Sequence, residues 1–111
     1  MDPKDLQRIS AEILILSLLE GRARHGYELS QLIGTRSDER LQYQVSSIYP
    51  MLHRLERKGL VRARWVEKAG ERRRRFYSIT PAGKKELVSQ RRAFRDFFSA
   101  LNQVTRFGHV S

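Results

Sequence analysis

Apolar residues recur at helical spacing in four separate parts of the chain, and two short β-prone stretches lie between the third and the fourth. In the first part, from about Asp5 to Leu19, the apolar residues begin on one face of a helix and then wrap around it. A helix that is apolar on nearly all sides must be covered on nearly all sides. We therefore expect a second chain to cover one face, formed by Ile9, Ile13 and Leu16, with burial inside the monomer as the alternative.

The second predicted helix spans His25 to Gly34, with Gly34 as its stop. Backbone N–H groups at the start of a helix favour anions, and His25 and Tyr27 are placed to assist phosphate binding there. Packing or local hydrogen bonding explains either side chain equally well. After a polar connection over residues 35–42, Tyr43 is expected to return to the core as a very short strand.

The third predicted helix begins near Val45 or Ser46 and is amphipathic, with a basic outer face. Its inward positions are Ile48, Leu52 and Leu55. Ser46 or Ser47 is expected to cap the first turn, and Pro50 lies near that turn, where a proline costs little. Gly59 is expected to end the helix in the left-handed conformation.

Two β-prone stretches follow, Val61–Glu67 and Arg74–Thr80, and residues 68–71 make the turn between them. They predict a hairpin with a basic tip. The tip carries four consecutive arginines, Arg72, Arg73, Arg74 and Arg75. Glu67 and Glu71 cannot pair all four, so we expect a strongly positive local field. A run of like charges is usually solvated, but the flanking aromatic strand residues favour a wing that grips a nucleic-acid backbone.

The last predicted helix begins at Thr80 and Pro81, a capping threonine before a proline in the first helical position, and continues to about Arg106. Apolar residues repeat along it as a short seam of the coiled-coil type, made of Leu87, Phe94, Phe97, Phe98, Leu101 and Val104. Such a seam needs a partner helix, so we expect a homodimer. The phenylalanines either pack as core or line a cavity at the dimer interface for a small aromatic or drug-like effector.

This order of elements predicts an α+β fold that is mainly α. It is a winged helix-turn-helix of three helices and a two-stranded β-wing, followed by a long C-terminal dimerisation helix. We expect residues 1–80 to form the DNA-binding domain and residues 81–111 the dimerisation helix and tail.

Composition narrows the class of partner. The chain of 111 residues has a formal net charge of +10 and a pI near 10.8, which favours a polyanion such as DNA, RNA or an anionic membrane surface. The sequence contains no cysteine, and its N-terminal apolar run is shorter than the roughly 18 residues of a membrane-spanning helix. The basic residues cluster on a hairpin rather than opposite an apolar helical face, which disfavours membrane binding. We expect a cytoplasmic protein.

Double-stranded DNA is the expected partner, because its major groove admits the N-terminal part of an α-helix. The positions expected nearest to base edges are Ser46, Ser47, Tyr49 and His53, and those expected at phosphates are Arg54, Arg57 and Lys58. A solvated face of an ordinary packing helix is the alternative for this helix alone. For the whole chain, the alternative function is a basic adaptor that binds RNA or a protein partner.

An enzyme is not expected. The histidines, His25, His53 and His109, lie on different elements without a paired carboxylate or cysteine at catalytic spacing, and no cofactor or metal is predicted.

Three spaced segments resemble the PadR-like transcriptional regulators over roughly residues 6–87. His25–Leu29 matches the family's H-G-Y-E-L segment. Ser46–Val61 matches its recognition segment G-T/S-L-Y-P-x-L-x-R-L-E-x-x-G-L-V/I, and Arg75–Gly83 matches the end of its wing, R-x-Y-x-L-T-x-x-G. The chain departs at Ser46, where the family usually has glycine or another small residue.

The resemblance implies a dimeric repressor whose C-terminal helix packs across its partner. A single short C-terminal helix is similar to the smaller subgroup of the family, of which some members sense phenolic or drug-like molecules. The operator is then expected to be a pseudo-palindrome.

Overall fold

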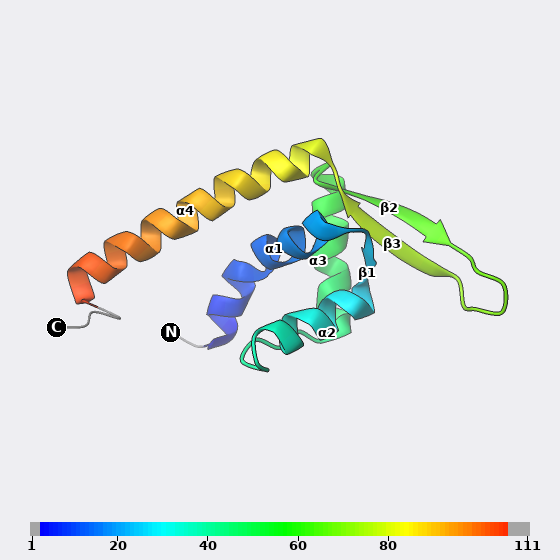
Figure 1. Cartoon of the computed structure of the whole chain (residues 1–111), viewed down its shortest axis with the longest axis horizontal. Helices are drawn as coiled ribbons and strands as arrows, with labels where there is room; N and C mark the ends of the chain where they lie inside the picture. Colours follow the sequence, from blue (N-terminus) through cyan, green and yellow to red (C-terminus); the bar gives the residue numbers. More distant parts are fainter. Residues whose placement is uncertain (1–2, 107–111) are drawn as a thin grey trace.

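The computed structural model describes the backbone of residues 3–106 and the side chains of residues 10–106. Four helices and a small antiparallel sheet follow the predicted order. The elements are α1 (Pro3–Gly21), β1 (Arg24–His25), α2 (Gly26–Arg36), α3 (Val45–Arg57), β2 (Val61–Val66), β3 (Arg74–Ile79) and α4 (Pro81–Thr105). The first three helices cluster together, the β2–β3 hairpin projects on one side, and α4 extends away on the other (Figure 1). The winged-helix architecture with a long final helix is confirmed.

The sheet has the strand order β1-β3-β2, so it contains one strand that the sequence did not predict. Arg24 and His25 pair with Tyr77 and Phe76 of β3. The prediction of a short strand at Tyr43 is wrong, because the backbone there forms no strand and the Tyr43 carbonyl accepts a hydrogen bond from the Ser30 hydroxyl instead. The Tyr43 ring still packs against the core, and burial raises the pKa of its hydroxyl to about 12.

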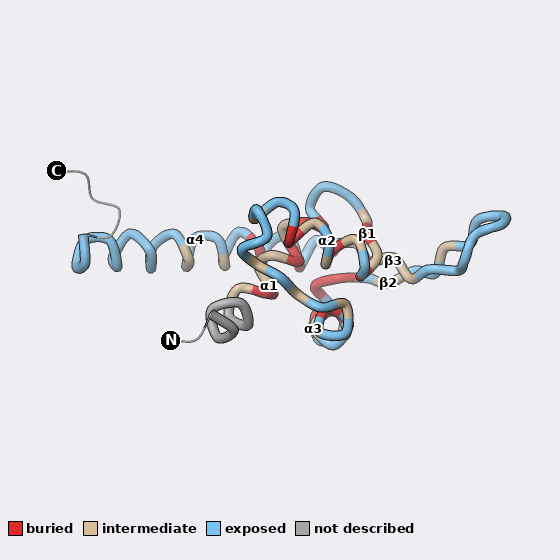
Figure 2. The backbone as a smooth tube through the Cα atoms, turned by 90° about the horizontal axis from the view of Figure 1, so that it is seen from below, coloured by how far each residue is buried: buried red, intermediate tan, exposed pale blue. Residues whose placement is uncertain are grey.

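The core draws large side chains from nearly every element. The fully buried ones are Ile15, Leu16, Leu19, Leu29, Ile48, Leu52, Leu55, Tyr77 and Leu87. The assignment of Leu16 and Leu87 to a partner-facing surface is therefore wrong, because both are enclosed by their own chain. Ile13 is half-buried at the edge of this core, and the side chain of Ile9 lies outside the described residues. Burial is dense in α1 to α3 and fades along α4 (Figure 2).

Two predicted helix boundaries need correction. Gly34 does not stop α2, which continues to Arg36; the chain then turns back so that the Glu39 backbone N–H donates to the Gly34 carbonyl at 2.7 Å. Gly34 is buried beneath this return, and a Cβ there would lie 3.1 Å from a Glu39 carboxylate oxygen. Gly34 therefore lies at a close packing contact with the Glu39 side chain and does not end the helix.

The start of α3 also differs from the prediction. Gln44 is the N-cap residue and no side chain caps the helix, so the expected capping by Ser46 or Ser47 is wrong. Both serines lie inside the first turn, exposed to solvent. Pro50 lies just after the first turn, close to its expected place, and it cannot donate to the Ser46 carbonyl one turn earlier. Ser46 is an exposed residue, so this carbonyl is not enclosed in the core.

The junctions around the hairpin are as predicted. Gly59 ends α3 with φ +76°, and the Thr80 hydroxyl caps α4 by accepting from the Gly83 N–H at 3.0 Å. The same hydroxyl donates to the Gly59 carbonyl at 2.7 Å, while the Thr80 N–H donates to the Leu60 carbonyl at 3.1 Å. The end of α3 and the start of α4 are therefore tied to each other directly.

The start of α2 is held by His25 and Arg24. His25 is the N-cap residue, and its Nδ1 accepts a hydrogen bond from the Glu28 N–H at 3.2 Å. The buried Arg24 bridges two helices, because its Nε donates to the Leu18 carbonyl and its Nη1 to Glu28, both at 2.8 Å. The His25 pKa is lowered below 6.5, first by burial and then by the positive charge of Arg74.

The close contact of Gly83 with Leu60 yields a stability prediction. A Cβ on Gly83 would lie 2.1 Å from the Leu60 carbonyl oxygen, so Gly83→Ala forces the α4 backbone away from the hairpin. We expect the free energy of unfolding in urea to fall by about 1–3 kcal/mol, as overpacking usually causes. The matched change Ser89→Ala, at an exposed position of the same helix, should stay within about 0.5 kcal/mol. A gain in stability with Gly83→Ala, as helix propensity alone predicts, would contradict this account.

The His25 cap yields a pH prediction. Because the folded pKa lies below the unfolded value of 6.5, the cap contributes fully above pH 6.5, and its contribution is lost as the pH falls through the folded pKa. We expect the free energy of unfolding to decrease over that range. His25→Asn keeps a capping acceptor that does not titrate, so the difference between the two pH profiles isolates His25. Parallel profiles for the two proteins would show that folding does not lower the pKa of His25.

Candidate nucleic-acid interface

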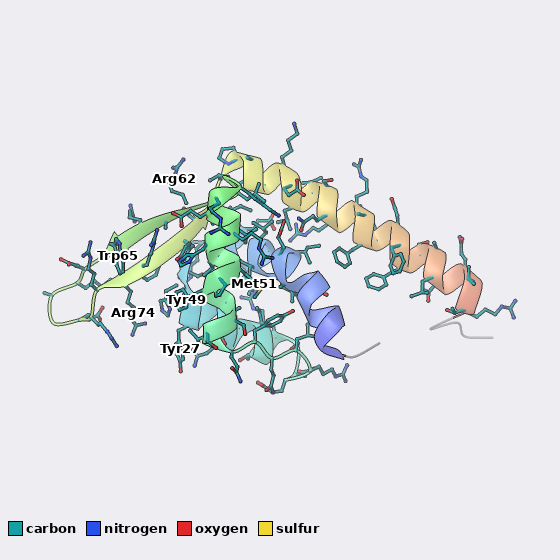
Figure 3. The ribbon with its side chains drawn as sticks, turned by 180° about the vertical axis from the view of Figure 1, so that it is seen from behind. Tyr27, Tyr49, Met51, Arg62, Trp65 and Arg74 are labelled. Atoms are coloured by element: carbon teal, nitrogen blue, oxygen red, sulfur yellow. The ribbon has the colours of Figure 1, made fainter. Side chains whose placement is uncertain are left out.

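The outward face of α3 is the centre of the candidate interface. At 100° per residue, Ser46, Pro50, His53 and Arg57 lie opposite the buried Ile48, Leu52 and Leu55, and all four are exposed. In Figure 3, α3 stands in front of the domain, with the hairpin on one side and α1 on the other. A single helix exposed along its length, with basic residues toward its C-terminal end, has the shape that a DNA major groove admits.

The remaining predicted positions on α3 separate onto its two flanks. Arg54 and Ser47 are exposed on the α1 side. Lys58 also faces α1, where its Nζ lies 3.2 Å from a Glu12 carboxylate oxygen. Lys58 is thus already ion-paired, whereas the sequence presented it as a phosphate ligand.

Tyr49 lies on the opposite flank, toward the hairpin and the start of α2. Its ring covers Gly26, where a Cβ would lie 2.8 Å from the ring. Tyr49 therefore has a packing role that the sequence did not indicate, although its side chain stays partly exposed. Gly26 is required because any larger residue would displace the ring.

The start of α2 lies next to the hairpin. Tyr27 is exposed, stacks against His25 with ring centroids 6.4 Å apart, and accepts a hydrogen bond from Gln31. One backbone donor of this helix end, the Glu28 N–H, is already paired with His25. A phosphate would therefore meet the earlier N–H groups together with the Tyr27 hydroxyl.

The wing arginines are more extensively paired than the sequence suggested. Arg75 Nη2 lies 3.1 and 3.3 Å from the two carboxylate oxygens of Glu56 on α3, and Arg73 Nε lies 3.3 Å from Glu67. Glu56 escaped the sequence analysis because it is 19 residues from Arg75 and precedes the hairpin. Of the two nearby acids, Glu67 pairs with Arg73, so the expectation that Glu67 and Glu71 cannot pair all four arginines holds; the pairing of Arg75 with the distant Glu56 was not predicted.

Arg74 competes with the cap of α2 for one imidazole. Its Nη1 lies 2.9 Å from His25 Nε2, while His25 Nδ1 accepts from the Glu28 N–H. A neutral imidazole has one acceptor nitrogen, so it cannot serve both donors at the same time. Of the two, the Arg74 contact is exposed, and a phosphate can draw the guanidinium away without opening the helix cap.

A cleft of about 590 Å³ joins these parts. It is lined by His25, Tyr27, Tyr49, His53, Trp65, Arg72, Arg73, Arg74, Arg75 and Tyr77. Eight of these ten residues are predicted DNA-binding positions, which the fold brings together from α2, α3 and the hairpin. Tyr77 forms the floor, where burial raises the pKa of its hydroxyl, which has no hydrogen-bond partner among the described residues.

Trp65 is the site residue that the sequence analysis missed. It is 51% exposed, and the Arg73 guanidinium lies over its ring at 4.5 Å from the centroid. The signal was present in the period-two alternation, since Val61, Ala63 and Trp65 share one face of β2 and only the first two reach the core. An aromatic residue on the inward face of a strand, but beyond the end of the core, is available for binding or for stacking.

The second half of α4 forms a separate apolar surface. Phe97 is 61% and Val104 84% exposed, and Phe98 and Leu101 are exposed as well. Phe94 is half-buried, with its ring centroid 6.0 Å from that of Phe98. The first half of the helix is held to α1, where Arg91 pairs with Glu20 at 3.1 Å and Gln90 donates to Glu12 at 2.7 Å.

None of the helices in the described part of the chain combines the length and the apolar content needed to cross a bilayer. Among the same residues, no group of three or more His, Cys, Asp or Glu side chains is arranged to hold a metal ion.

Known proteins are similar to this chain in sequence and in fold. The model of the PadR-like family of transcriptional regulators matches residues 15–89. The transcriptional regulator Rv3488 of Mycobacterium tuberculosis is 36% identical over 95 residues, which cover 84% of this chain and 83% of that protein.

Solved structures of transcriptional regulators have a similar fold. A transcriptional regulator from Clostridium thermocellum superposes with a TM-score of 0.85 at 28% identity, covering 95% of this chain and 99% of that one. Bacillus subtilis PadR in complex with operator DNA superposes with a TM-score of 0.66 at 25% identity, covering 72% of this chain and 45% of that one. The family match spans most of the winged-helix domain and includes α3 and the hairpin. The chain belongs to the PadR-like family of transcriptional regulators, which are DNA-binding proteins and not enzymes.

Proposed function

We propose that the chain is a homodimeric repressor that acts in the cytoplasm and binds a pseudo-palindromic operator. The observation that carries the proposal is the continuous surface made by the outward stripe of α3, the start of α2 and the wing arginines. The Bacillus subtilis relative was solved with operator DNA, which supports DNA as the polyanion.

In the proposed complex, α3 enters the major groove by its N-terminal half. Ser46 and His53 on the outward stripe face base edges, Arg57 on the same stripe reaches a phosphate, and Ser47, Tyr49 and Arg54 flank them. The wing arginines and the start of α2 contact the backbone on the hairpin side. Lys58 contributes only if it leaves Glu12, so we assign it a smaller part.

The dimer is proposed from α4. Exposed phenylalanines in the last three turns of a projecting helix are costly in water, and a second copy of the same helix covers them symmetrically. Two α3 helices related by the dyad would enter successive major grooves about 34–36 Å apart. A small aromatic effector held between the phenylalanines would change this separation and release the operator.

The main experiment is a selection from a pool of random DNA duplexes. We expect the enriched sequences to share an inverted repeat, with roughly 10³- to 10⁵-fold weaker binding in 200 mM than in 50 mM salt if the dimer makes about 6–10 phosphate contacts. Arg57→Gln should weaken binding to all sequences alike, and Ser46→Ala should change the preference between them. Equal binding to any duplex and to a matched RNA would instead favour the adaptor function.

The dimer is tested by Phe97→Glu, which places a charge in the proposed seam. We expect the wild-type chain to sediment as a dimer and the variant as a monomer, because a buried unpaired carboxylate is strongly unfavourable. Ser99→Glu adds the same charge two residues along α4 at an exposed position and should leave the dimer intact. An unchanged dimer with Phe97→Glu would place the interface elsewhere, and a dimer crystal structure with no cavity between the phenyl rings would exclude the effector site.

A further inference from the structure

Trp65 and Arg73 form a stacked pair at the base of the hairpin turn. Trp65 lies on β2 opposite Arg75 of β3, and the Arg73 guanidinium, just before β3, lies over the indole at 4.5 Å from the centroid. Arg75 approaches the same ring less closely, at 5.8 Å. Figure 3 shows Trp65 on the hairpin, beyond the edge of α3. An arginine face is attracted to the ring of a tryptophan at such distances.

The two arginines are held in different ways. Arg75 is fixed by both carboxylate oxygens of Glu56, which belongs to another element of the domain. Arg73 has an ion pair with Glu67, but both side chains are mostly exposed, at 56% and 72%, and such pairs are strongly screened. The indole ring therefore restrains Arg73 at least as much as this ion pair does.

The contact with Trp65 leaves the Nη donors of Arg73 accessible. The Arg73 guanidinium carbon lies over the indole ring and Nε faces Glu67, which leaves the Nη groups as the donors for a ligand. In-plane donors are those that bind a phosphate in a bidentate manner. An unrestrained arginine in a hairpin tip would instead lose several rotatable bonds on binding.

We propose that Trp65 is a positioning residue that preorganises Arg73 for a phosphate of the DNA backbone beside the groove that α3 enters. The inference rests on the proposed DNA binding but not on sequence specificity, since phosphate contacts form on any duplex. Trp65 acts through Arg73 and makes no base contact of its own.

The test is a double-mutant cycle on a random-sequence duplex, with dissociation constants measured over a series of salt concentrations. Arg73→Gln should reduce the slope of log K against log salt by about 0.9 for each protomer bound. Trp65→Leu should weaken binding roughly threefold to tenfold, and Trp65→Phe, which keeps an aromatic face, should weaken it less. In the Arg73→Gln background, Trp65→Leu should have almost no further effect.

The matched control is Arg64→Gln, which removes a charge from the other face of β2, away from the indole. There, Trp65→Leu should weaken binding by its full factor. Equal effects of Trp65→Leu in both arginine backgrounds would overturn the proposal, because a residue that only stabilises the hairpin or that contacts DNA itself gives that result. Unchanged binding with Trp65→Leu would overturn it too.

A measurement without DNA separates this inference from the proposed function. Trp65 is the only tryptophan in the sequence, so the protein's tryptophan fluorescence reports this ring alone. Arg73→Gln should change the emission of the free protein, and Glu67→Gln should change it much less. Identical spectra for wild type and Arg73→Gln would show that the stack is absent. A clear change, together with a selection that enriches no sequence, would reject the proposed operator binding and leave the Trp65–Arg73 pair standing.

Discussion

The arrangement of the molecule depends on the burial of three side chains of α3. Ile48, Leu52 and Leu55 are essentially inaccessible to solvent, and each contributes roughly 1.5–3 kcal/mol by leaving water. Because they lie within one narrow arc of the helix, their burial fixes its rotation about its own axis. The polar stripe then has one direction in which to face, and the rest of the interface is positioned relative to it.

The hairpin and α4 are held in fixed positions relative to α3 by short contacts at the end of that helix. Gly59 turns the chain out of α3, and Thr80 returns it to within hydrogen-bond distance of Gly59 and Leu60. Gly83 then allows the α4 backbone to lie directly on the Leu60 carbonyl. The spatial relation between the outward face of α3 and the projecting apolar helix is therefore set by short contacts among the main chain and one capping hydroxyl, that of Thr80.

Local signals in the sequence were sufficient for most of this architecture. Gly59 after the last turn of α3, the Thr80–Pro81 pair before α4 and the two β-prone stretches each predict the backbone conformation of their own few residues. All of these predictions were correct. The strand at Arg24 and His25 could not be found in this way, because two residues have no periodicity and their partner, β3, lies about fifty residues further along the chain. The same limit hid the pairing of Lys58 with Glu12 and of Arg75 with Glu56.

Apolar periodicity alone did not show which residues of α4 are buried within the chain and which belong to the proposed dimer interface. Leu87 and Phe97 belong to the same seam in the sequence, yet Leu87 is enclosed by the domain and Phe97 projects into solvent. The pattern states which face of α4 is apolar, while the length over which α1 covers that face is a property of the assembled fold. Trp65 shows the converse case. It continues the inward face of β2, but the core ends at Ala63, two residues earlier.

The two-residue strand β1 has a mechanical consequence. Through the pairing of His25 with Phe76, the capping residue of α2 is part of the same sheet as the hairpin. A force that tilts the hairpin is therefore transmitted to the first turn of α2 through the backbone hydrogen bonds of the sheet. The two parts of the surface that we propose to contact the DNA backbone are thus joined by one sheet, and we expect them to move together.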